Sequence, residues 1–311
     1  MSRSSKPVQQ PEAAGINQKG APQNGKKENP ASSLVEVDLA AQSHTGNEMP
    51  RNEDHYLVVR ADRSLRAMQS NLPEGAVPHT VDETAYGMIV ADGISGMPAG
   101  GIASSMALKK LIDLVVKTPD WIMRMNRRKA AIVKQRLIKR FREVDSSLRA
   151  HGERDPRLAG MGTTMTAALS LGADLFLGHI GDSRAYLLRD DELYQLTSDH
   201  TLAQAMIEAG VATEEDANVR GLRRVLTAAL GSTAQPADPE VQRMRLSHGD
   251  QLLLCTDGLF ESVDQVTIRA ILLKASSAED ACAALINEAM TRGGSDNVTV
   301  VVARYRFPQA G

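Results

Sequence analysis

Short apolar runs that meet an acidic residue recur along this chain, and they constrain its fold more than any other feature. In the clearest case, residues 86–91 form an apolar run typical of a buried strand, and Asp92 and Gly93 follow directly. A buried carboxylate without a partner is costly, so Asp92 is expected to be hydrogen-bonded, paired with a base or bound to a cation. A single example of this pattern could equally be an ordinary turn.

The pattern occurs at four more places, each with an acidic residue at the edge of an expected strand. Several carboxylates that converge from different elements are what a pair of hard cations such as Mg²⁺ or Mn²⁺ requires. The pattern therefore fits a two-metal site. The acidic residues are Glu53 and Asp54 before residues 55–59, Asp182 after 175–180, Asp257 after 251–256, and Asp296 before 298–302.

Composition limits the classes of partner and compartment. The formal net charge of the 311 residues is -2, which argues against a general attraction to nucleic acid or to an anionic membrane. Cys255 and Cys282 are too few for a disulfide framework and favour a reducing compartment. No apolar run approaches the roughly 20 residues of a membrane span, and no signal-peptide core is visible. The sequence predicts a cytoplasmic monomer without nucleic-acid or membrane partners.

The chain divides into a polar tail and one long folded region. Residues 1–33 are rich in Gln, Pro, Asn, Ser, Gly and Lys and hold almost no large apolar side chains, so they cannot bury enough surface to become ordered. We expect a disordered tail there and a single domain over residues 34–308. Residues 60–82, which are polar and contain two prolines, are expected to form a hairpin excursion or a surface loop.

Apolar periodicity predicts the remaining elements. Groups of strands flanked by pairs of helices favour an α+β arrangement in layers over a repeating βαβ barrel. Strands are expected within 34–59 and over 86–91, 163–171, 173–180, 184–189, 192–196, 241–246, 251–256 and 297–305, and helices over 103–117, 126–150, 201–209, 214–230, 266–274 and 278–292.

The helix expected over residues 126–150 is unusually basic on one side. It places Val133, Leu137, Phe141, Val144 and Leu148 on one face. The basic face could dock an acidic or phosphorylated partner, but a charge run on a helix usually faces water, and that interpretation is favoured. The basic residues are Arg127, Arg128, Lys129, Lys134, Arg136, Lys139, Arg140 and Arg142.

Taken together, the motifs resemble the metal-dependent protein phosphatase family, also called the protein phosphatase 2C family, in its bacterial form. The resemblance runs over residues 37–305, and eight motifs in the family's order make a chance match very improbable. The motifs are residues 52–54 (NED), 90–93 (VADG) with Gly96 and Gly100, 160–164 (GMGTT), 181–186 (GDSRAY), 196–200 (LTSDH), 226–231 (LTAALG), 254–259 (LCTDGL) and 294–299 (GSDNVT).

The resemblance implies a fold and a ligand set. The fold would be a four-layer αββα sandwich with two central, mainly antiparallel sheets, making 34–308 a catalytic domain. Two Mn²⁺ or Mg²⁺ ions would bind at one edge, with a third, weaker ion possible. By the resemblance, Asp92 bridges both metals, Gly93 offers a carbonyl, Asp257 and Asp296 are direct ligands, Glu53 and Asp54 contact metal-bound water, and Asp182 serves the third ion.

The resemblance also implies a reaction. A hydroxide that bridges two metal ions would attack the phosphorus of phosphoserine or phosphothreonine, with Asp92, Asp257 and Asp296 as catalytic residues. Phosphorylated proteins would be the partners, including a serine/threonine kinase or its substrates. Residues 201–224 match a mobile flap that influences substrate choice. Some relatives carry a proton-donating histidine where this chain has Ile94, so a metal-bound water is the expected donor here.

Three departures from the family pattern bear on phosphate binding. The usual phosphate-binding arginine is replaced by Met49, which leaves Arg51 as the candidate substitute. Ser95 replaces a glycine, and Ala228 replaces an arginine. Two alternatives therefore stay open beside an active protein phosphatase. One is a pseudophosphatase that acts as a binding or regulatory module, and the other is a phosphohydrolase of small phosphate esters.

Single residues near these motifs have simpler interpretations. His55, His179 and His200 are expected to be hydrogen-bonded structural residues, because isolated histidines beside strands seldom bind metals. Cys255 is expected in the core, where burial raises the pKa of a thiol and suppresses its reactivity. Asp182 could also be a turn aspartate that pairs with Arg184, so its place in the fold decides between the two roles.

Overall fold

A computed structural model describes most of the chain beyond the polar tail. The described residues are 34–69, 71–73, 76, 79–94, 99–117, 127–213, 216, 221–231 and 236–308. The tail predicted over 1–33 lies outside them, as do Ser95, Gly96 and part of the expected flap. Within the described residues, no helix combines the length and the apolar character that crossing a bilayer requires.

Two five-stranded sheets form the centre of the molecule. The first has the order β1-β10-β9-β6-β7, and the second has the order β2-β3-β4-β5-β8. Every neighbouring pair of strands within them is antiparallel. The strands of the first sheet are β1 (Glu36–His44), β10 (Val298–Arg306), β9 (Gln251–Cys255), β6 (Arg184–Arg189) and β7 (Glu192–Gln195); those of the second are β2 (His55–Arg66), β3 (Thr80–Ala91), β4 (Met165–Leu171), β5 (Asp174–Ile180) and β8 (Glu240–Arg245).

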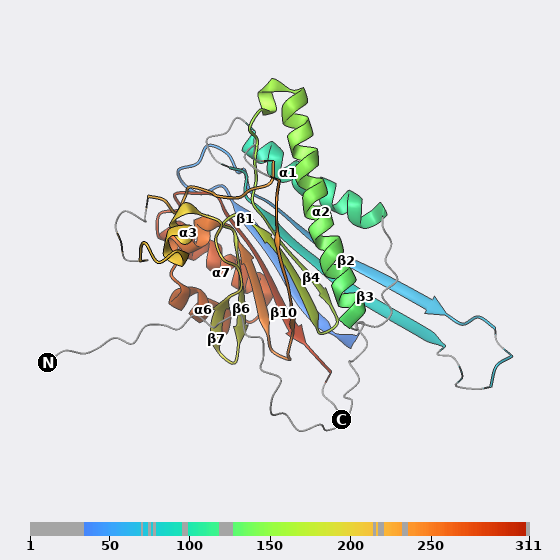
Figure 1. The fold of residues 1–311 in the computed structure, drawn as a ribbon. Coiled ribbons are helices and arrows are strands. Elements are labelled where there is room, and N and C mark those ends of the chain that lie inside the picture. The colour runs from blue at the N-terminus through green and yellow to red at the C-terminus, as the bar shows by residue number, and fades with distance from the viewer. Residues whose placement is uncertain are drawn as a thin grey trace.

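Helices cover the outer faces of both sheets, which gives four layers (Figure 1). Helices α1 and α2 pack on the second sheet, whereas α6 and α7 pack on the first. Two shorter helices, α3 and α5, and the 3-10 turn η2 lie in the connections. The helices are α1 (Gly100–Lys117), α2 (Arg127–Arg154), α3 (Leu202–Glu208), α5 (Asp257–Ser262), α6 (Gln265–Lys274) and α7 (Ala278–Thr291), and η2 is Pro156–Leu158.

Three apolar clusters fill the spaces between the four layers. Residues from both sheets, such as Met88, Leu254 and Tyr305, form the central cluster. Ile89 and Phe141 belong to the cluster beneath α1 and α2, and the third cluster lies beneath α6 and α7. Successive side chains of a strand point to opposite faces. A strand buried on both faces therefore needs a continuous apolar run, which is the pattern that the sequence shows.

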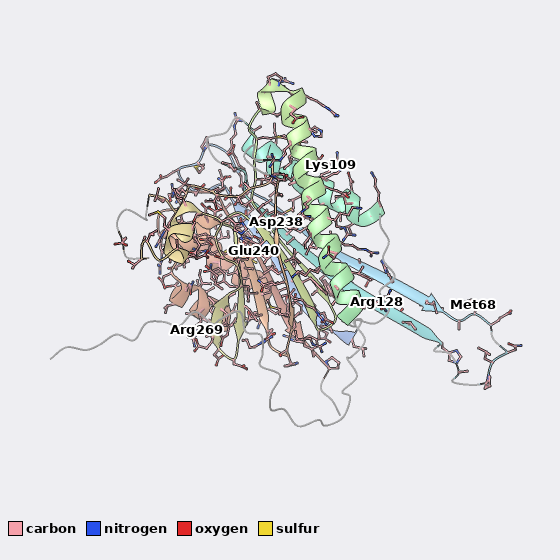
Figure 2. All side chains as sticks on the ribbon, in the orientation of Figure 1. Met68, Lys109, Arg128, Asp238, Glu240 and Arg269 are labelled. Atoms are coloured by element: carbon pink, nitrogen blue, oxygen red, sulfur yellow. The ribbon has the colours of Figure 1, made fainter. Side chains whose placement is uncertain are left out.

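The region expected to be a hairpin or a surface loop is largely strand. Strands β2 and β3 pair from His55 opposite Ala91 to Arg66 opposite Thr80. The paired ribbon extends beyond the body of the sandwich, and Met68 lies past its end (Figure 2). Of the two structures expected for residues 60–82, the hairpin is therefore the one that forms.

The helix predicted over residues 214–230 is wrong for the part that the structure describes. Residues 221–224 form a turn, and Leu226 and Leu230 form isolated bridges with Thr201 and Thr163. The backbone N–H of Leu230 donates a hydrogen bond to the carbonyl of Thr163 at 2.9 Å. Backbone groups that pair with other segments are not available for a helix, so the apolar spacing here reflects burial against neighbouring loops.

Candidate metal centre

Asn297 ties the acidic pair Glu53–Asp54 to the start of β10. Its side-chain oxygen accepts a hydrogen bond from the backbone N–H of Glu53 at 2.8 Å. Its amide nitrogen donates to the carbonyls of Thr45 and Arg51 at 2.6 and 2.9 Å. One buried amide therefore holds the β1–β2 connection against the loop that carries Asp296, and it brings acidic residues from both ends of the chain together.

Asp92 follows β3 and is fixed through its backbone. Its N–H donates to the Thr164 hydroxyl at 3.0 Å, and its carbonyl accepts from the Thr163 hydroxyl at 2.6 Å. The next residue must be glycine, because a Cβ atom on Gly93 would lie 2.3 Å from the Gly100 carbonyl. The backbone of Asp92 is thus held by neighbouring segments, which fixes the position from which its carboxylate extends.

Asp257 is the first residue of α5, a short helix that the sequence did not predict. Thr256 occupies the N-cap position, and Gly258 follows Asp257. A Cβ atom on Gly258 would lie 2.1 Å from the Asn297 carbonyl oxygen. Only a glycine permits this close approach of α5 to the loop of Asp296. The two backbones that carry Asp257 and Asp296 are therefore in contact.

Asp54 is almost fully buried and only half satisfied. Its Oδ2 accepts a hydrogen bond from the Thr256 hydroxyl at 2.7 Å, whereas its buried Oδ1 has no hydrogen-bond partner among the residues that the structure describes. Burial raises the pKa of Asp54 to about 6, against an ordinary value of 3.8. An orphaned carboxylate oxygen at this position is an acceptor that still needs a proton or a cation.

The carboxyl groups of Asp92 and Asp257 are also buried and have raised pKa values. Burial is the main cause that raises the pKa of each well above its ordinary value, and repulsion between the carboxylates adds to it. Asp54, Asp182 and Asp296 all contribute to that repulsion at Asp92. Five of the six predicted acidic residues therefore act on one another in a single region of the fold, namely Asp54, Asp92, Asp182, Asp257 and Asp296.

Asp182, which follows β5, belongs to the same region. It is 8% exposed, and burial, followed by repulsion from Asp199, raises its pKa to about 7. Arg184, its suggested turn partner, instead makes a two-pronged contact with Asp199 at 2.8 and 2.6 Å. Its guanidinium also stacks 3.7 Å from the centre of the Phe260 ring. The geometry therefore favours a place in the acidic cluster over the turn pair.

Arg224 is a basic residue of this region that sequence reasoning missed. It forms an ion pair with Glu261 of α5, one helical turn beyond Asp257, with Nε to Oε1 at 3.2 Å. The bond to Glu261, and then the charges of Asp257 and Asp296, raise the pKa of Arg224. The arginine in turn opposes the effect of burial on the pKa of Asp296. Its position in the expected flap was the only sequence signal.

The side chain of Arg51 is not placed as expected for a phosphate ligand. Its side chain is exposed, and the contact that links it to this centre runs through its backbone carbonyl, which accepts a hydrogen bond from Asn297. The nearby histidine and cysteine fit structural roles. His179 is buried, contacts Thr166 at 2.9 Å and has a pKa lowered by burial to about 4. Burial raises the pKa of the Cys255 thiol.

The donor chemistry of the cluster fits hard divalent cations. Its side-chain ligand atoms are carboxylate oxygens, and one buried acceptor, Asp54 Oδ1, lacks a partner within the described part of the chain. Among the residues that the structure describes, no three acidic, histidine or cysteine side chains are gathered closely enough to hold one ion unaided. That finding is compatible with Mg²⁺-type sites, which commonly use one or two carboxylates and several waters.

Comparisons with known proteins identify the family. The protein phosphatase 2C family model matches residues 76–290. The serine/threonine protein phosphatase PstP of Mycobacterium tuberculosis is 39% identical over 218 residues, which cover 70% of this chain and 40% of PstP. The serine/threonine phosphatase stp of Listeria innocua is 32% identical over 256 residues, which cover 82% of this chain and 98% of that protein. This chain therefore belongs to the protein phosphatase 2C family, although it spans less than half the length of the mycobacterial relative.

Solved structures agree with this assignment. The crystal structure of the M. tuberculosis phosphatase PstP/Ppp has a TM-score of 0.69 at 33% identity, and it covers 88% of this chain and 100% of its own. A crystal structure of the PstP catalytic domain in complex with two manganese ions has a TM-score of 0.67 at 32% identity, with 88% and 99% covered. The layered α+β sandwich expected from the sequence is confirmed.

Proposed function

We propose that this protein is a metal-dependent serine/threonine protein phosphatase that hydrolyses phosphoserine and phosphothreonine. The observation that carries the proposal is the cluster of buried aspartates with raised pKa values, in which Asp54 Oδ1 has no hydrogen-bond partner. Relatives named serine/threonine phosphatases, and a similar domain solved with two manganese ions, support the same conclusion.

The proposed metal ligands are those that the resemblance to the family implies, and the buried aspartates support them. When bound, two Mn²⁺ or Mg²⁺ ions acidify a water molecule and offset charge on the phosphoryl group. Hydrogen bonds between the Asp92 backbone and the hydroxyls of Thr163 and Thr164 keep Asp92 in place, and the Thr256 hydroxyl orients Asp54. We assign direct contacts to Asp92, the Gly93 carbonyl, Asp257 and Asp296, contacts through water to Glu53 and Asp54, and a third, weaker ion to Asp182.

Arg224 is the side chain that we expect to orient the phosphoryl group. It is 63% exposed at its side chain, so it remains accessible to substrate. The ion pair with Glu261 keeps it beside the helix that carries Asp257. An arginine offers a planar fork that matches phosphate oxygens. Arg51 lacks a comparable link between its side chain and the acidic residues, so Arg224 replaces it in this proposal.

The proposed substrates are phosphorylated proteins, including a serine/threonine kinase or its targets, and the proposed compartment is the cytoplasm. The relatives' names support the class of substrate. The cysteine usage of the chain supports the compartment.

Phosphate release from a phosphothreonine peptide tests the proposal. Mn²⁺ should support turnover, EDTA should abolish it, and Asp257→Asn should lower it by about a thousandfold, because losing a ligand forfeits several kcal/mol of metal assistance. Asp238→Asn is the matched control, since Asp238 is 85% exposed and pairs with Arg142 at the surface. The control should retain full activity.

The same assay separates the alternatives. Turnover of p-nitrophenyl phosphate without turnover of any phosphopeptide would favour a phosphohydrolase of small esters. Manganese binding without release of phosphate from either substrate would favour a pseudophosphatase.

A further inference from the structure

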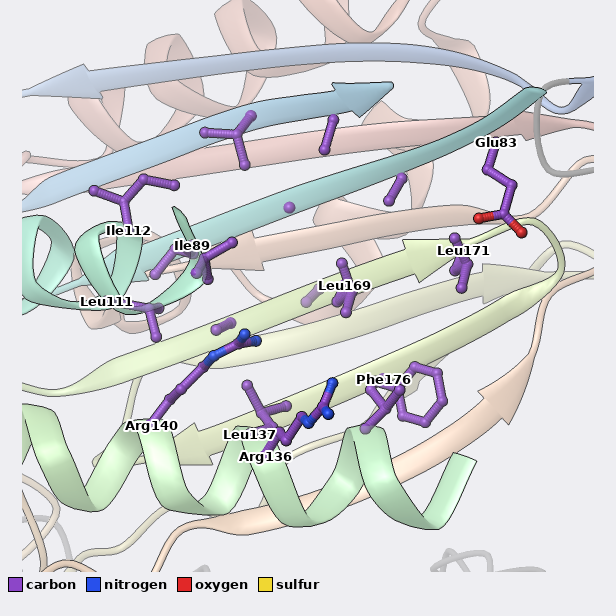
Figure 3. A pocket seen from close by; sticks show the side chains of 18 of the residues that line it. Glu83, Ile89, Leu111, Ile112, Arg136, Leu137, Arg140, Leu169, Leu171 and Phe176 are labelled. Atoms are coloured by element: carbon purple, nitrogen blue, oxygen red, sulfur yellow. The ribbon is translucent and has the colours of Figure 1, made fainter. Parts of the chain in front are cut away.

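Strand β5 is packed closely against helix α2. A Cβ atom on Gly178 would lie 2.9 Å from the Phe141 ring, so the strand and the helix meet there without an intervening side chain. Figure 3 shows Arg136 and Arg140 extending from the helix towards the sheet, where both line a cavity together with Phe176 of β5. The solvated face expected for the basic residues of this helix is therefore wrong for these two arginines, which are partly buried. Helix α2 thus holds β5 itself, whereas other contacts hold the turn that follows the strand.

Gly181, Asp182 and Ser183 connect β5 to β6. Gly181 has a left-handed backbone conformation, with φ at +106°, and a Cβ atom there would lie 2.5 Å from the side chain of Thr164. The Thr164 hydroxyl accepts the N–H of Asp92 and contacts the Ser183 hydroxyl at 2.7 Å. The conformation of this turn therefore determines how Asp182 is placed relative to Asp92.

His200 forms hydrogen bonds with both backbone polar groups of Gly181. Its own N–H donates to the Gly181 carbonyl at 2.7 Å, and its Nδ1 accepts the Gly181 N–H at 3.1 Å. Because a backbone N–H can only donate, Nδ1 carries no proton and the ring proton is on Nε2. Nε2 lies 3.4 Å from Oε1 of Glu240, which fits that tautomer. The ring and the backbone of His200 therefore both hold Gly181.

The backbone of His200 is also held from its other side, by the segment 225–227. The carbonyl of His200 accepts the N–H of Thr227 at 2.8 Å, and the N–H of Leu202 donates to the carbonyl of Val225 at 2.8 Å. These bonds do not involve the ring. Replacing the imidazole should therefore remove the Nδ1 bond and leave the path of the backbone in place.

We propose that His200 is a positioning residue, whose ring keeps Asp182 in the acidic cluster by fixing the backbone of Gly181. Glycine adopts positive and negative φ about equally readily, so Gly181 permits this turn without specifying it. The hydrogen bond from its N–H to Nδ1 selects one conformation. The proposal rests on the role proposed above for Asp182, which is to bind a third, weaker metal ion.

Amide hydrogen exchange of Gly181, measured by NMR on the metal-free protein, tests the hydrogen bond itself. The side-chain amide of His200→Gln reaches past the position of Nδ1, so exchange should become at least about tenfold faster. The shorter His200→Asn can place an oxygen at that position and should stay within about threefold of wild type. His248→Gln is the matched control, because Nδ1 of the exposed His248 accepts the N–H of Phe307 at 3.2 Å, at the end of β10 that lies away from Asp296. It should leave exchange at Gly181 unchanged.

Calorimetric binding of Mn²⁺ measures the consequence for the metal centre. The weakest Mn²⁺ site should lose about fivefold in affinity in His200→Gln and keep its affinity in His200→Asn. Asp182→Asn should weaken the same site at least as much. Adding His200→Gln to Asp182→Asn should cause no further loss, because His200 acts through Asp182, whereas a residue that only stabilises the fold would add its own loss.

Turnover provides a third readout. The Mn²⁺ concentration for half-maximal release of phosphate from a phosphothreonine peptide should rise by the same factor in His200→Gln, while the KM for the peptide stays within about twofold. Unchanged exchange in His200→Gln, equal losses of Mn²⁺ affinity in His200→Asn and His200→Gln, additive losses in the double variant, or wild-type Mn²⁺ affinity in Asp182→Asn would overturn the proposal. Exchange and calorimetry do not depend on turnover, so a wild type that releases no phosphate would contradict the phosphatase proposal and leave this one to be decided by those two measurements.

Discussion

Two sets of buried aspartates in this protein meet the same physical problem in opposite ways. Asp145, Asp174 and Asp250 are at most 2% exposed, and each pairs with an arginine. The contacts are short, for example 2.6 Å between Asp174 and Arg243. At the acidic edge, Asp54 and Asp182 are nearly as buried, but their nearest charged neighbours include other carboxylates, and their pKa values are raised.

The difference separates carboxylates that stabilise the fold from carboxylates that we propose to bind metal ions. A buried charge is tolerated when an opposite charge and hydrogen bonds compensate its desolvation. Arginines supply that compensation for the first set throughout the sandwich. In the second set the carboxylates repel one another, and a bound divalent cation would offset that repulsion. Removing a charge from the first set should therefore lower the stability of the protein. Removing one from the second set should raise the stability of the metal-free protein and weaken metal binding.

The largest effect is expected from Asp145→Ala in the paired set. Asp145 accepts hydrogen bonds from the backbone N–H groups of Gly231 and Ala237 at 2.8 and 3.1 Å, and from Arg149 at 2.9 Å. Removing it leaves these donors unsatisfied and should cost about 3 kcal/mol of unfolding free energy. Urea unfolding measures this cost. Asp155→Ala, which removes a surface pair with Arg157, should change stability far less.

The second effect concerns pH and the acidic set. The pKa of Asp182 is about 7 in the folded protein against an ordinary 3.8. Below about pH 4 the group is protonated in both the folded and unfolded states. As pH rises towards 7 the unfolded state loses its proton first, so Asp182 should make the metal-free fold less stable by about 2 kcal/mol or more.

The difference in stability between wild type and Asp182→Asn in EDTA isolates this contribution. Wild type should lose stability relative to the variant between about pH 4 and 7, and the difference should become constant above that. The lowered pKa of His179 acts in the opposite direction over the same range, but it is common to both proteins and cancels. A difference that does not vary with pH would place Asp182 among the compensated carboxylates.

A smaller effect, of opposite sign to that of Asp145→Ala, is expected from Asp92→Asn. The variant removes one charge from the repulsive cluster, and its new amide N–H group could donate to the orphaned Asp54 Oδ1. We expect the metal-free protein to gain about 1 to 2 kcal/mol in urea unfolding. Manganese should stabilise wild type but not the variant. A loss of stability comparable to that of Asp145→Ala would remove the distinction between the two sets.

Local sequence patterns predicted most of the strands and helices, because apolar runs and capping residues within each element determine its type. Strand β9 is a continuous apolar run buried on both faces, and helix α7 begins where the Ser277 hydroxyl accepts from the N–H of Asp280. Short elements escaped prediction. Helix α5 has six residues, too few for a periodic pattern. Within residues 221–230, Thr227 and Leu230 form backbone hydrogen bonds with the distant His200 and Thr163.

The candidate site was only partly visible in the sequence for a related reason. Acidic residues at strand ends can be recognised in the sequence, because each lies beside an apolar run. The compensating and orienting contacts do not, since they join distant segments. Arg224 and Glu261 are 37 positions apart, and Arg184 passes over the adjacent turn to reach Asp199. Such pairs are set by the packing of loops, which no spacing rule encodes.

The smallest effect is expected from Arg224→Gln, because Arg224 is exposed and its pair with Glu261 contributes little to the fold. It is paired with Glu261 of α5 beside the acidic set, so its removal tests whether an arginine helps the acidic residues to bind substrate. We expect the KM for a phosphothreonine peptide to rise about fivefold with kcat within about twofold, which corresponds to about 1 kcal/mol. Arg224→Lys should recover part of the loss, since it keeps the charge without the fork. Arg157→Gln, at a side chain 88% exposed, should leave KM unchanged. An unchanged KM in Arg224→Gln would mean that Arg224 does not contribute to binding of the phosphopeptide, which would leave the metal ions as the positive charges at this site.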